Sequence, residues 1–222
     1  STRKESSAAS DVYKRQEPML LEQNGKENKA LRYLEGCTAY QIAVQAVPEI
    51  EKKQILFLPM PMIKDKKVLR KIHAKGAETI GQFLEQGYSI AFLTIGDPTV
   101  YSTCMYVEQM IEQQGYPVET VSGIPSFCAA AARLNQPLGE QEDQIHILPG
   151  SYEAGEGLQL SGTKILMKTG KKMAQVKAVL KEEGQQAKMV MNCGMDGEKI
   201  YKCTEEIPVS YTHLRAHETG RN

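Results

Sequence analysis

Apolar and polar residues alternate along this chain in blocks that predict strands separated by helices. Short apolar runs rich in β-formers predict strands at 55–58, 88–95, 117–121, 144–148, 164–167 and 188–192. Apolar residues at helical spacing predict helices over 68–84, 105–114, 127–134 and 171–183. Gly-, Glu- and Gln-rich stretches at 139–143 and 150–162 predict surface loops. Strands that alternate with helices indicate an α/β layer fold.

The run at 91–95 is the most distinctive of the predicted strands. It is short, nearly uncharged and rich in β-formers, as expected of a central parallel strand buried on both faces. It ends at Gly96-Asp97-Pro98, and an amphipathic helix follows. In open α/β sheets, ligands bind where a strand ends in such a loop. Two interpretations stay open: the loop is a ligand wall, or it is an ordinary turn that Asp97 caps locally.

Both ends of the chain carry sequence that we interpret as foreign to the protein. SSAASDVYKRQ (6–16) and VSYTHLRAHET (209–219) back-translate into the two adapters of a transposon-based sequencing library, in opposing orientation. We therefore expect residues 1–16 and 208–222 to be non-native tails and exclude them from fold reasoning. Two disordered polar tails are the alternative, which the composition allows but which does not predict those codons.

Charge and composition exclude several classes of function. The tails hold six of the 27 basic and three of the 27 acidic residues, so 21 and 24 remain, a net charge of −3. Such a balance does not attract nucleic acid or an anionic membrane, and no apolar run approaches transmembrane length. The five cysteines form no C-x-x-C pair, which predicts reduced thiols in a cytoplasmic protein. His73 and His146 stand alone, so we expect no metal site and a structural role for His146.

The common nucleotide and nucleophile motifs do not occur. No G-x-G-x-x-G follows a predicted strand, and Gly170-Lys171 lacks the upstream glycine of a phosphate-binding loop, so TGKK indicates a helix start. VSGIPSF lacks the second glycine of a nucleophile elbow. Spacing alone therefore predicts a small-molecule site at two loops, IGDPTVYST and VSGIPSF, without defining its chemistry.

A resemblance to a known family supplies that chemistry. The tetrapyrrole methylase family resembles this chain in LTIGDPTVYSTCMYV, GYPVETVSGIPSFCAAAARLNQPLGE, TAYQIAVQAVPEI, ILFLPMPM, IHILPGSYE, KILMKTGKK and NCGMDGEKIY, which together cover most of residues 38–207. Within the family, the motifs are most similar to enzymes that methylate C20 of precorrin-2 or cobalt-factor II in cobalamin biosynthesis. The resemblance implies a two-domain α/β enzyme, usually a homodimer. It also implies that S-adenosylmethionine (SAM) binds between the domains and methylates a carbon of an acidic tetrapyrrole.

The resemblance also implies which residues bind SAM. These are Ile95, Gly96, Asp97, Val100 and Tyr101 on one wall, Pro125 and Ser126 on another, and Met167 with the Asn192 region in the second domain. Gly96 would let the backbone pass close to the ligand, and Asp97 would accept from an amine or a ribose hydroxyl. Amides near Ser126 would face the ligand from a helix N-terminus. Met167 would pack an adenine edge, and an ordinary core methionine is the alternative.

The implied chemistry asks little of the side chains. A sulfonium methyl group is already activated, so in-line attack by a ring carbon depends on alignment and water exclusion more than on a strong acid or base. A proton must later leave C20. Tyr101 and Asp97 are the candidates for accepting it.

We expect an N-terminal α/β domain at 17–123 and a C-terminal α/β domain at 124–207, with Gly123 at the boundary. The family's opening strand and Gly-Pro-Gly-Asp-Pro loop do not occur in this sequence. Residues 29–37 correspond either to the helix that follows that loop or to a variable insert. We also expect the last strand to be missing. A chain truncated in this way is expected to fold poorly or to bind SAM weakly.

Two alternatives to the C20 methyltransferase stay open. One is another methylase of the family that acts on a different ring carbon or intermediate. The other is an α/β fragment that binds a ligand without turnover. The sequence also leaves open whether the substrate contains cobalt.

Overall fold

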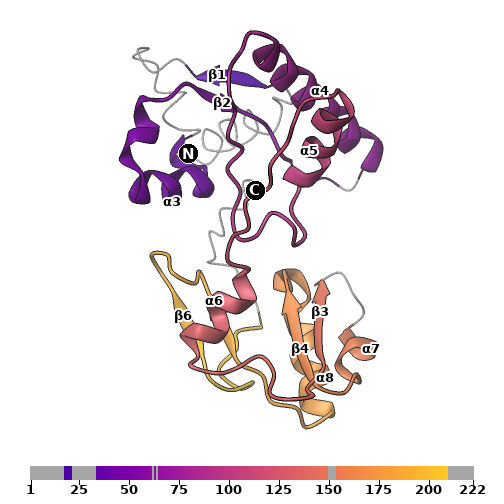
Figure 1. The fold of residues 1–222 in the computed structure, drawn as a ribbon. Coiled ribbons are helices and arrows are strands. Elements are labelled where there is room, and N and C mark those ends of the chain that lie inside the picture. The colour runs from indigo at the N-terminus through magenta and orange to yellow at the C-terminus, as the bar shows by residue number, and fades with distance from the viewer. Residues whose placement is uncertain (1–17, 22–33, 62, 64, 150–153, 210–222) are drawn as a thin grey trace, which may run out of the picture. The chain divides into compact units, whose positions relative to one another are not determined.

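The computed structural model describes residues 18–21, 34–61, 63, 65–149 and 154–209. The described residues divide into two compact units, the first ending at Gly123 and the second beginning at Ile124 (Figure 1). This division falls at the glycine where the sequence predicts a boundary, although the assignment of the units as domains stays a prediction. Most of each proposed non-native tail, and most of the ambiguous stretch at 29–37, lies outside the described residues.

The first unit combines a short β-ribbon with helices. Its elements are β1 (Met19–Leu21), α3 (Thr38–Ala46), the 3₁₀-helix η1 (Pro48–Lys52), β2 (Ile55–Phe57), α4 (Lys66–Glu85) and α5 (Cys104–Gln113). Strands β1 and β2 are antiparallel, with Leu20 opposite Leu56. The sequence predicts β2, α4 and α5, whereas it predicts neither β1 nor α3.

Helix α4 begins and ends at residues suited to those positions. The carboxylate of Asp65 accepts hydrogen bonds from the amides of Lys67 (2.9 Å) and Val68 (3.1 Å), which satisfies two of the donors left open at a helix start. At the other end, the amide of Gly87 donates to the carbonyl oxygen of Leu84, and Gly87 has a φ of +86° that favours glycine. The predicted helix and its glycine stop are confirmed.

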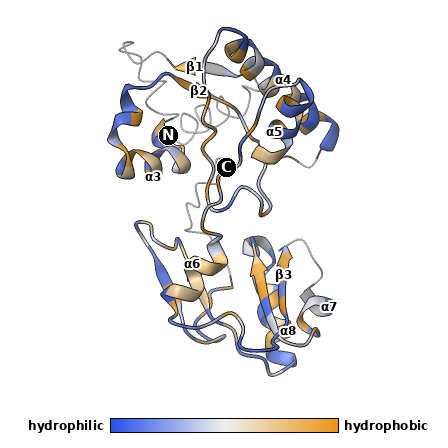
Figure 2. Cartoon of the chain, in the orientation of Figure 1, coloured by the Kyte–Doolittle hydropathy of each residue, from blue (hydrophilic) through white to orange (hydrophobic). Residues whose placement is uncertain are grey.

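Helices α4 and α5 share the core of the first unit. Figure 2 shows hydrophilic and hydrophobic colours alternating along α4, as in an amphipathic helix with one apolar face. The buried cluster consists of Ala77, Ile80, Val107 and Ile111. Leu56 and Leu58 from the β2 region pack against it, together with Phe92. The run that contains Phe92 is thereby attached to the helices, immediately before the Gly-Asp-Pro loop.

The prediction of a buried central strand at 88–95 is wrong. The segment pairs with no described strand, and Leu93 and Ile95 are 42% and 58% exposed. Phe92 and Thr94 are partly buried, so the run is covered on one face, whereas a central strand needs a neighbour along each edge and cover on both faces. The strand predicted at 117–121 is wrong for the same reason, since it also pairs with no described strand and Val121 is 74% exposed.

The second unit carries two small sheets. Its elements are α6 (Ser126–Arg133), β3 (Ile145–Pro149), α7 (Ala154–Leu158), β4 (Thr163–Met167), η2 (Gly170–Lys172), α8 (Met173–Glu182), β5 (Met189–Met191) and β6 (Lys199–Tyr201). Strands β3 and β4 are parallel, with Leu148 opposite Leu166. Strands β5 and β6 form an antiparallel hairpin, with Val190 opposite Ile200.

One core serves both sheets of the second unit. The buried cluster consists of Leu158, Met173, Val176, Leu180 and Ile207, which come from α7, α8 and the segment after β6. Leu166 of β4, Met189 of β5 and Tyr201 of β6 pack against it. The parallel pairing, the helix start at TGKK, and strands at β3, β4 and β5 confirm the α/β expectation. A loop throughout 150–162 is wrong, because α7 lies there and Leu158 is 2% exposed.

The described residues thus form a mixed α/β structure. None of their helices has the length and apolar character needed to cross a membrane.

His73 is a buried polar group in the first unit. It lies on α4, is 6% exposed, and stacks on Tyr106 of α5 with ring centroids 5.6 Å apart and an interplanar angle of 7°. Its Nε2 atom has no hydrogen-bond partner. Burial disfavours the charged imidazolium and lowers the pKa of His73.

We expect His73 to make the first unit sensitive to mild acid. Because folding lowers the pKa of this side chain, its neutral form contributes fully above the unfolded pKa of about 6.5, and this contribution is lost as the pH falls towards the folded pKa. His73→Phe retains an aromatic ring against Tyr106 and removes the titration. Urea denaturation between pH 7.5 and 5, followed by circular dichroism, should show a loss of stability in the wild type that is smaller in the variant. An equal loss in both proteins would contradict the assignment.

Candidate functional site

The Gly-Asp-Pro loop is organised around the carboxylate of Asp97. One oxygen, Oδ1, accepts hydrogen bonds from the amide (2.8 Å) and the hydroxyl (2.5 Å) of Thr99. The other, Oδ2, accepts from the hydroxyl of Ser122 (2.8 Å) and the amide of Gly123 (3.0 Å). Asp97 is only 7% exposed. A single side chain therefore joins the Gly-Asp-Pro loop to the segment that precedes the second unit.

This hydrogen bonding strongly favours the ionised carboxylate. Four hydrogen bonds lower the pKa of Asp97 to about 2. The bond from the Thr99 hydroxyl has the largest effect and that from the Ser122 hydroxyl the next, and the amides of Thr99 and Gly123 add to them. Burial acts in the opposite direction and raises the pKa. A carboxylate has roughly four lone-pair directions, and four donors already occupy them. The local cap that the sequence suggests is present, and a ligand group would have to replace one of these donors.

The two loops also approach each other through their backbones. Gly96 has a φ of +79°, which favours glycine. A Cβ atom placed on Gly123 would overlap the carbonyl oxygen of Gly96 and lie 3.4 Å from the Cα of Asp97. Glycine is thus needed at Gly123 because of close approach, and at Gly96 because of its backbone conformation.

The remaining predicted residues of the first unit lie on the same loop. The amide of Val100 donates to the carbonyl oxygen of Asp97 (3.1 Å), which closes a turn, and Val100 is partly buried. Tyr101 has a φ of +50°, uncommon for a non-glycine residue, and is 51% exposed. Ile95 is 58% exposed at the other side of the turn. Backbone in this region tends to persist at functional sites, where the surrounding contacts hold it.

A second polar chain supports the far side of this loop. The hydroxyl of Ser102 lies 3.1 Å from that of Thr94 and 3.0 Å from the sulfur of Cys104, which is buried at the start of α5. Thr94 precedes the Gly-Asp-Pro turn and Cys104 opens the helix. The loop is therefore held from within, by Asp97, and at both of its ends.

In the second unit, Pro125 and Ser126 lie at the start of α6. Pro125 occupies the N-cap position, no side chain caps the helix, and its carbonyl oxygen accepts from the amides of Cys128 (3.0 Å) and Ala129 (3.2 Å). Ser126 is exposed in the first turn. No side chain therefore caps the start of α6, and its role in binding SAM stays a prediction.

Met167 and Asn192 each lie at the C-terminal end of a strand. Met167 is the last residue of β4 and is partly buried, and Lys168 after it has a φ of +58°. Asn192 directly follows β5, is partly buried and has a φ of +50°. Strand ends followed by left-handed residues are suited to presenting backbone to a ligand, and asparagine tolerates this conformation better than most residues.

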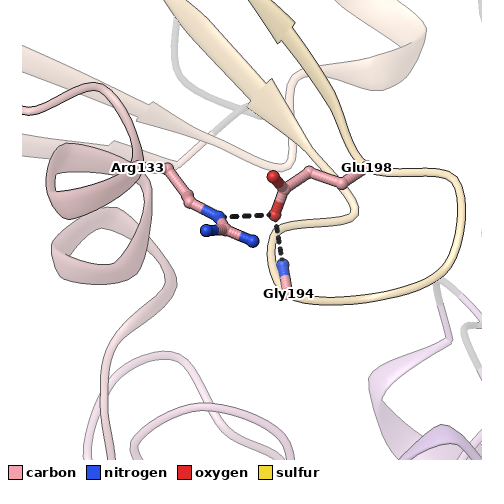
Figure 3. Close-up of polar contacts among 3 residues, drawn as sticks. All are labelled: Arg133, Gly194 and Glu198. Atoms are coloured by element: carbon pink, nitrogen blue, oxygen red, sulfur yellow. Dashed lines mark hydrogen bonds and ion pairs between the residues drawn. The ribbon is translucent and has the colours of Figure 1, made fainter.

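The sequence analysis missed a polar contact beside Asn192. Figure 3 shows Arg133, the last residue of α6, pointing towards Glu198. The Arg133 Nε donates to Oε2 of Glu198 (2.9 Å), and the amide of Gly194 donates to the same oxygen (2.6 Å). Both bonds lower the pKa of Glu198, the one from Gly194 more than the one from Arg133. Sixty-five residues separate Arg133 from Glu198, so no local pattern signals the contact.

Other candidate chemistry is not supported among the described residues. His146 Nε2 lies 2.9 Å from the carbonyl oxygen of Ser161, a contact consistent with a structural role. All five cysteines are described and have free thiols. No group of three or more His, Cys, Asp or Glu side chains there is placed to hold a metal ion.

Comparison with known proteins gives a family and several relatives. The sequence model of the tetrapyrrole (corrin/porphyrin) methylases matches residues 28–208. The chain is 39% identical over 131 residues to a protein named probable cobalt-precorrin-2 C(20)-methyltransferase from Methanocaldococcus jannaschii, covering 59% of this chain and 54% of the relative. It is 27% identical over 164 residues to the cobalt-precorrin-2 C(20)-methyltransferase of Salmonella typhimurium, covering 71% and 68%.

A further relative is the precorrin-2 C(20)-methyltransferase of a Sinorhizobium species, 29% identical over 112 residues, with 49% of this chain and 45% of the relative covered. The chain therefore spans about half the length of the first of these relatives.

We expect Gly123→Ala to disrupt the loop junction. The added methyl group meets the backbone of Gly96, which cannot rotate away. The free energy of unfolding of the variant should therefore be about 1–3 kcal/mol lower than that of the wild type. Gly76→Ala is the matched control, because the nearest atom to its Cβ is Leu58 Cδ2 at 3.8 Å and alanine favours a helix interior by about 0.5–1 kcal/mol. Urea denaturation of both variants measures the difference. Equal stabilities would contradict the close approach at Gly123.

Asp97 should contribute to stability in an acid-dependent way. Folding lowers its pKa from 3.8 to about 2, so its contribution is fully present above about pH 5 and disappears as the pH falls through about 2. Asp97→Asn should therefore be less stable than the wild type at pH 7, and the gap should narrow steadily below pH 4. Ser122→Ala, which removes one of the donors, should give a smaller effect of the same kind. A gap that stays constant between pH 7 and pH 2 would refute this account.

Proposed function

Because this chain belongs to the tetrapyrrole methylase family, we propose that it acts as a SAM-dependent C-methyltransferase that adds a methyl group at C20 of precorrin-2 or cobalt-factor II, in cobalamin biosynthesis. The observation that carries this proposal is the 39% identity over 131 residues with the relative from Methanocaldococcus jannaschii. The chain spans about half of that relative, so the activity of the whole protein is part of the proposal. The substrate is an acidic tetrapyrrole, and a homodimer and a cytoplasmic location stay predictions.

The first-unit loop supplies a surface suited to SAM. We assign Ile95, Gly96, Val100 and Tyr101 to direct contact, because they lie on one anchored turn whose apolar and aromatic side chains at Ile95 and Tyr101 are more than half exposed. Asp97 is placed under this surface, where its four donors set the shape of the turn. Asp97 can accept a hydrogen bond from the ligand only if a ligand donor replaces one of these four donors.

The second unit contributes residues at the ends of its own elements. We assign Pro125 and Ser126, at the uncapped start of α6, to a polar contact, since the exposed amides of a first helical turn favour a negatively charged group. Met167 and Asn192, at the ends of β4 and β5, are assigned to packing and backbone contacts. Met167 is neither fully buried nor fully exposed, which suits a flexible side chain against a ring edge.

The chemistry follows from position more than from acid or base strength. When bound, SAM supplies an activated methyl group for in-line attack by the ring carbon. The residues of this chain then have to orient the reactants and exclude water, and such placement lowers barriers by up to roughly 7–11 kcal/mol in model systems. A pKa of about 2 makes Asp97 a weak base at neutral pH. Tyr101 carries a hydroxyl proton that it would have to give up before it could accept the proton from C20, so Asp97 and Tyr101 both stay candidates for this step.

Two other functions remain as alternatives. Relatives of the same family model share the fold and the methyl donor, so a different ring carbon or intermediate is compatible with 27–39% identity. A ligand-binding fragment without turnover is the second alternative, because the predicted strand at 88–95 lacks neighbours among the described residues.

The decisive assay combines binding with product analysis. The purified chain is titrated with SAM by calorimetry and then incubated anaerobically with reduced precorrin-2, or with cobalt-factor II, and SAM that carries a ¹³C methyl group. The proposal predicts one added methyl group, which NMR locates at C20. A methyl group at another carbon would favour the first alternative. Binding of SAM without methyl transfer would favour the second, and absence of both would contradict the function for this chain.

A further inference from the structure

A seven-residue loop, 192–198, joins β5 to β6 and carries Asn192 at its start. Three of its residues, Asn192, Gly194 and Gly197, have φ angles of +50°, +74° and +79°. Within the loop, the amide of Met195 donates to the carbonyl oxygen of Asn192 (2.9 Å). The amide of Glu198 donates to the carbonyl oxygen of Met195 (3.1 Å). These turns fold the loop back on itself, although neither of them attaches it to the rest of the second unit.

The attachment comes from the contact drawn in Figure 3. Oε2 of Glu198 accepts one hydrogen bond from Gly194, inside the loop, and one from Arg133, at the end of α6. The same carboxylate oxygen thus closes the loop across its base and connects it to the helix that begins at Pro125 and Ser126. Since α6 starts with two of the proposed SAM contacts and Asn192 is another, the contact connects elements that both serve the proposed site.

A purely stabilising role does not suit this contact. The side chain of Arg133 is 55% exposed and that of Glu198 is 19% exposed, so water screens the pair, and exposed ion pairs contribute little to folding stability. A nearby contact, from Nζ of Lys188 to Oε1 of Gln136 (2.6 Å), also bridges the residues after α6 and those before β5, yet it does not involve the loop. The ion pair with Arg133 therefore contributes little to the stability of the second unit as a whole, and the main effect of the Glu198 carboxylate is on the loop that contains Gly194.

We propose that Arg133 and Glu198 are positioning residues that hold the 192–198 loop in the conformation that binds SAM. This inference rests on the proposed function. Arg133 acts through Glu198, and Glu198 acts through the amide of Gly194, so that the backbone beside Asn192 is ordered before the ligand arrives. Ordering in advance reduces the conformational cost of binding.

The test compares variants that separate loop order from stability. Arg133→Gln removes the ion pair, and Arg133→Lys keeps the charge. Lys188→Gln is the matched control, because it loses the exposed contact with Gln136, which joins the residues after α6 to those before β5 and does not involve the loop. For each full-length chain, calorimetry gives the Kd for SAM, thermal unfolding gives Tm, and hydrogen exchange gives the protection of amides 192–198.

The inference predicts that Arg133→Gln raises the Kd for SAM roughly threefold to tenfold and speeds exchange in the loop, while Tm changes little. Arg133→Lys should recover part of the affinity, and Lys188→Gln should bind SAM as the wild type does. If the wild type binds SAM and Arg133→Gln binds it equally well, the positioning role is wrong and the proposed function stands. If Lys188→Gln weakens binding as much as Arg133→Gln, the effect is general loosening and the inference is also wrong. If the wild type does not bind SAM, the proposed function is wrong, and so is the inference that rests on it.

Discussion

The junction of the two loops in the first unit depends on one buried carboxylate. Asp97 accepts four hydrogen bonds, two from Thr99 within its own turn and two from Ser122 and Gly123, so this one side chain joins both loops. An isolated buried charge is costly, whereas one that is fully hydrogen-bonded is stable and directional. The turn of Gly96 and the close approach of Gly123 follow from this arrangement, because both bring backbone within reach of the same side chain.

Helical segments were the most predictable part of the fold. Helix α4 follows from apolar residues at helical spacing, an aspartate at its N-cap and a glycine after its end, all of which act within a few residues of one another. The strand at 88–95 was not predictable in the same way. Its composition suits a buried strand, yet a strand exists only if another segment pairs with it, and none of the described strands does so. Strand β1 was missed because a short apolar run alone does not distinguish a strand from a helix, whereas the equally short β2 is followed by a Pro-Met-Pro turn signal.

The candidate site shows the same division between local and distant information. The turn at Asp97 and the glycine at Gly96 can be predicted from the sequence, because Gly-Asp-Pro defines a tight turn by itself. The partners of Asp97 in Ser122 and Gly123 lie 25 and 26 residues away, and the Arg133–Glu198 contact spans 65 residues, so only the fold reveals them. Family resemblance located the loops, whereas the structure shows what holds each loop in place.

The resulting account assigns different tasks to neighbouring residues. Asp97 in the first unit and Glu198 in the second are carboxylates that shape a loop, and residues beside them, such as the exposed Tyr101 and the partly buried Asn192, are proposed to contact the ligand. A crystal structure of the chain with bound SAM tests this division most directly. The account predicts that Asp97 keeps its bonds from Thr99, Ser122 and Gly123 while SAM contacts the outer face of the loop. A structure in which the amine or a ribose hydroxyl of SAM binds Asp97, with Ser122 and Gly123 released, would contradict it.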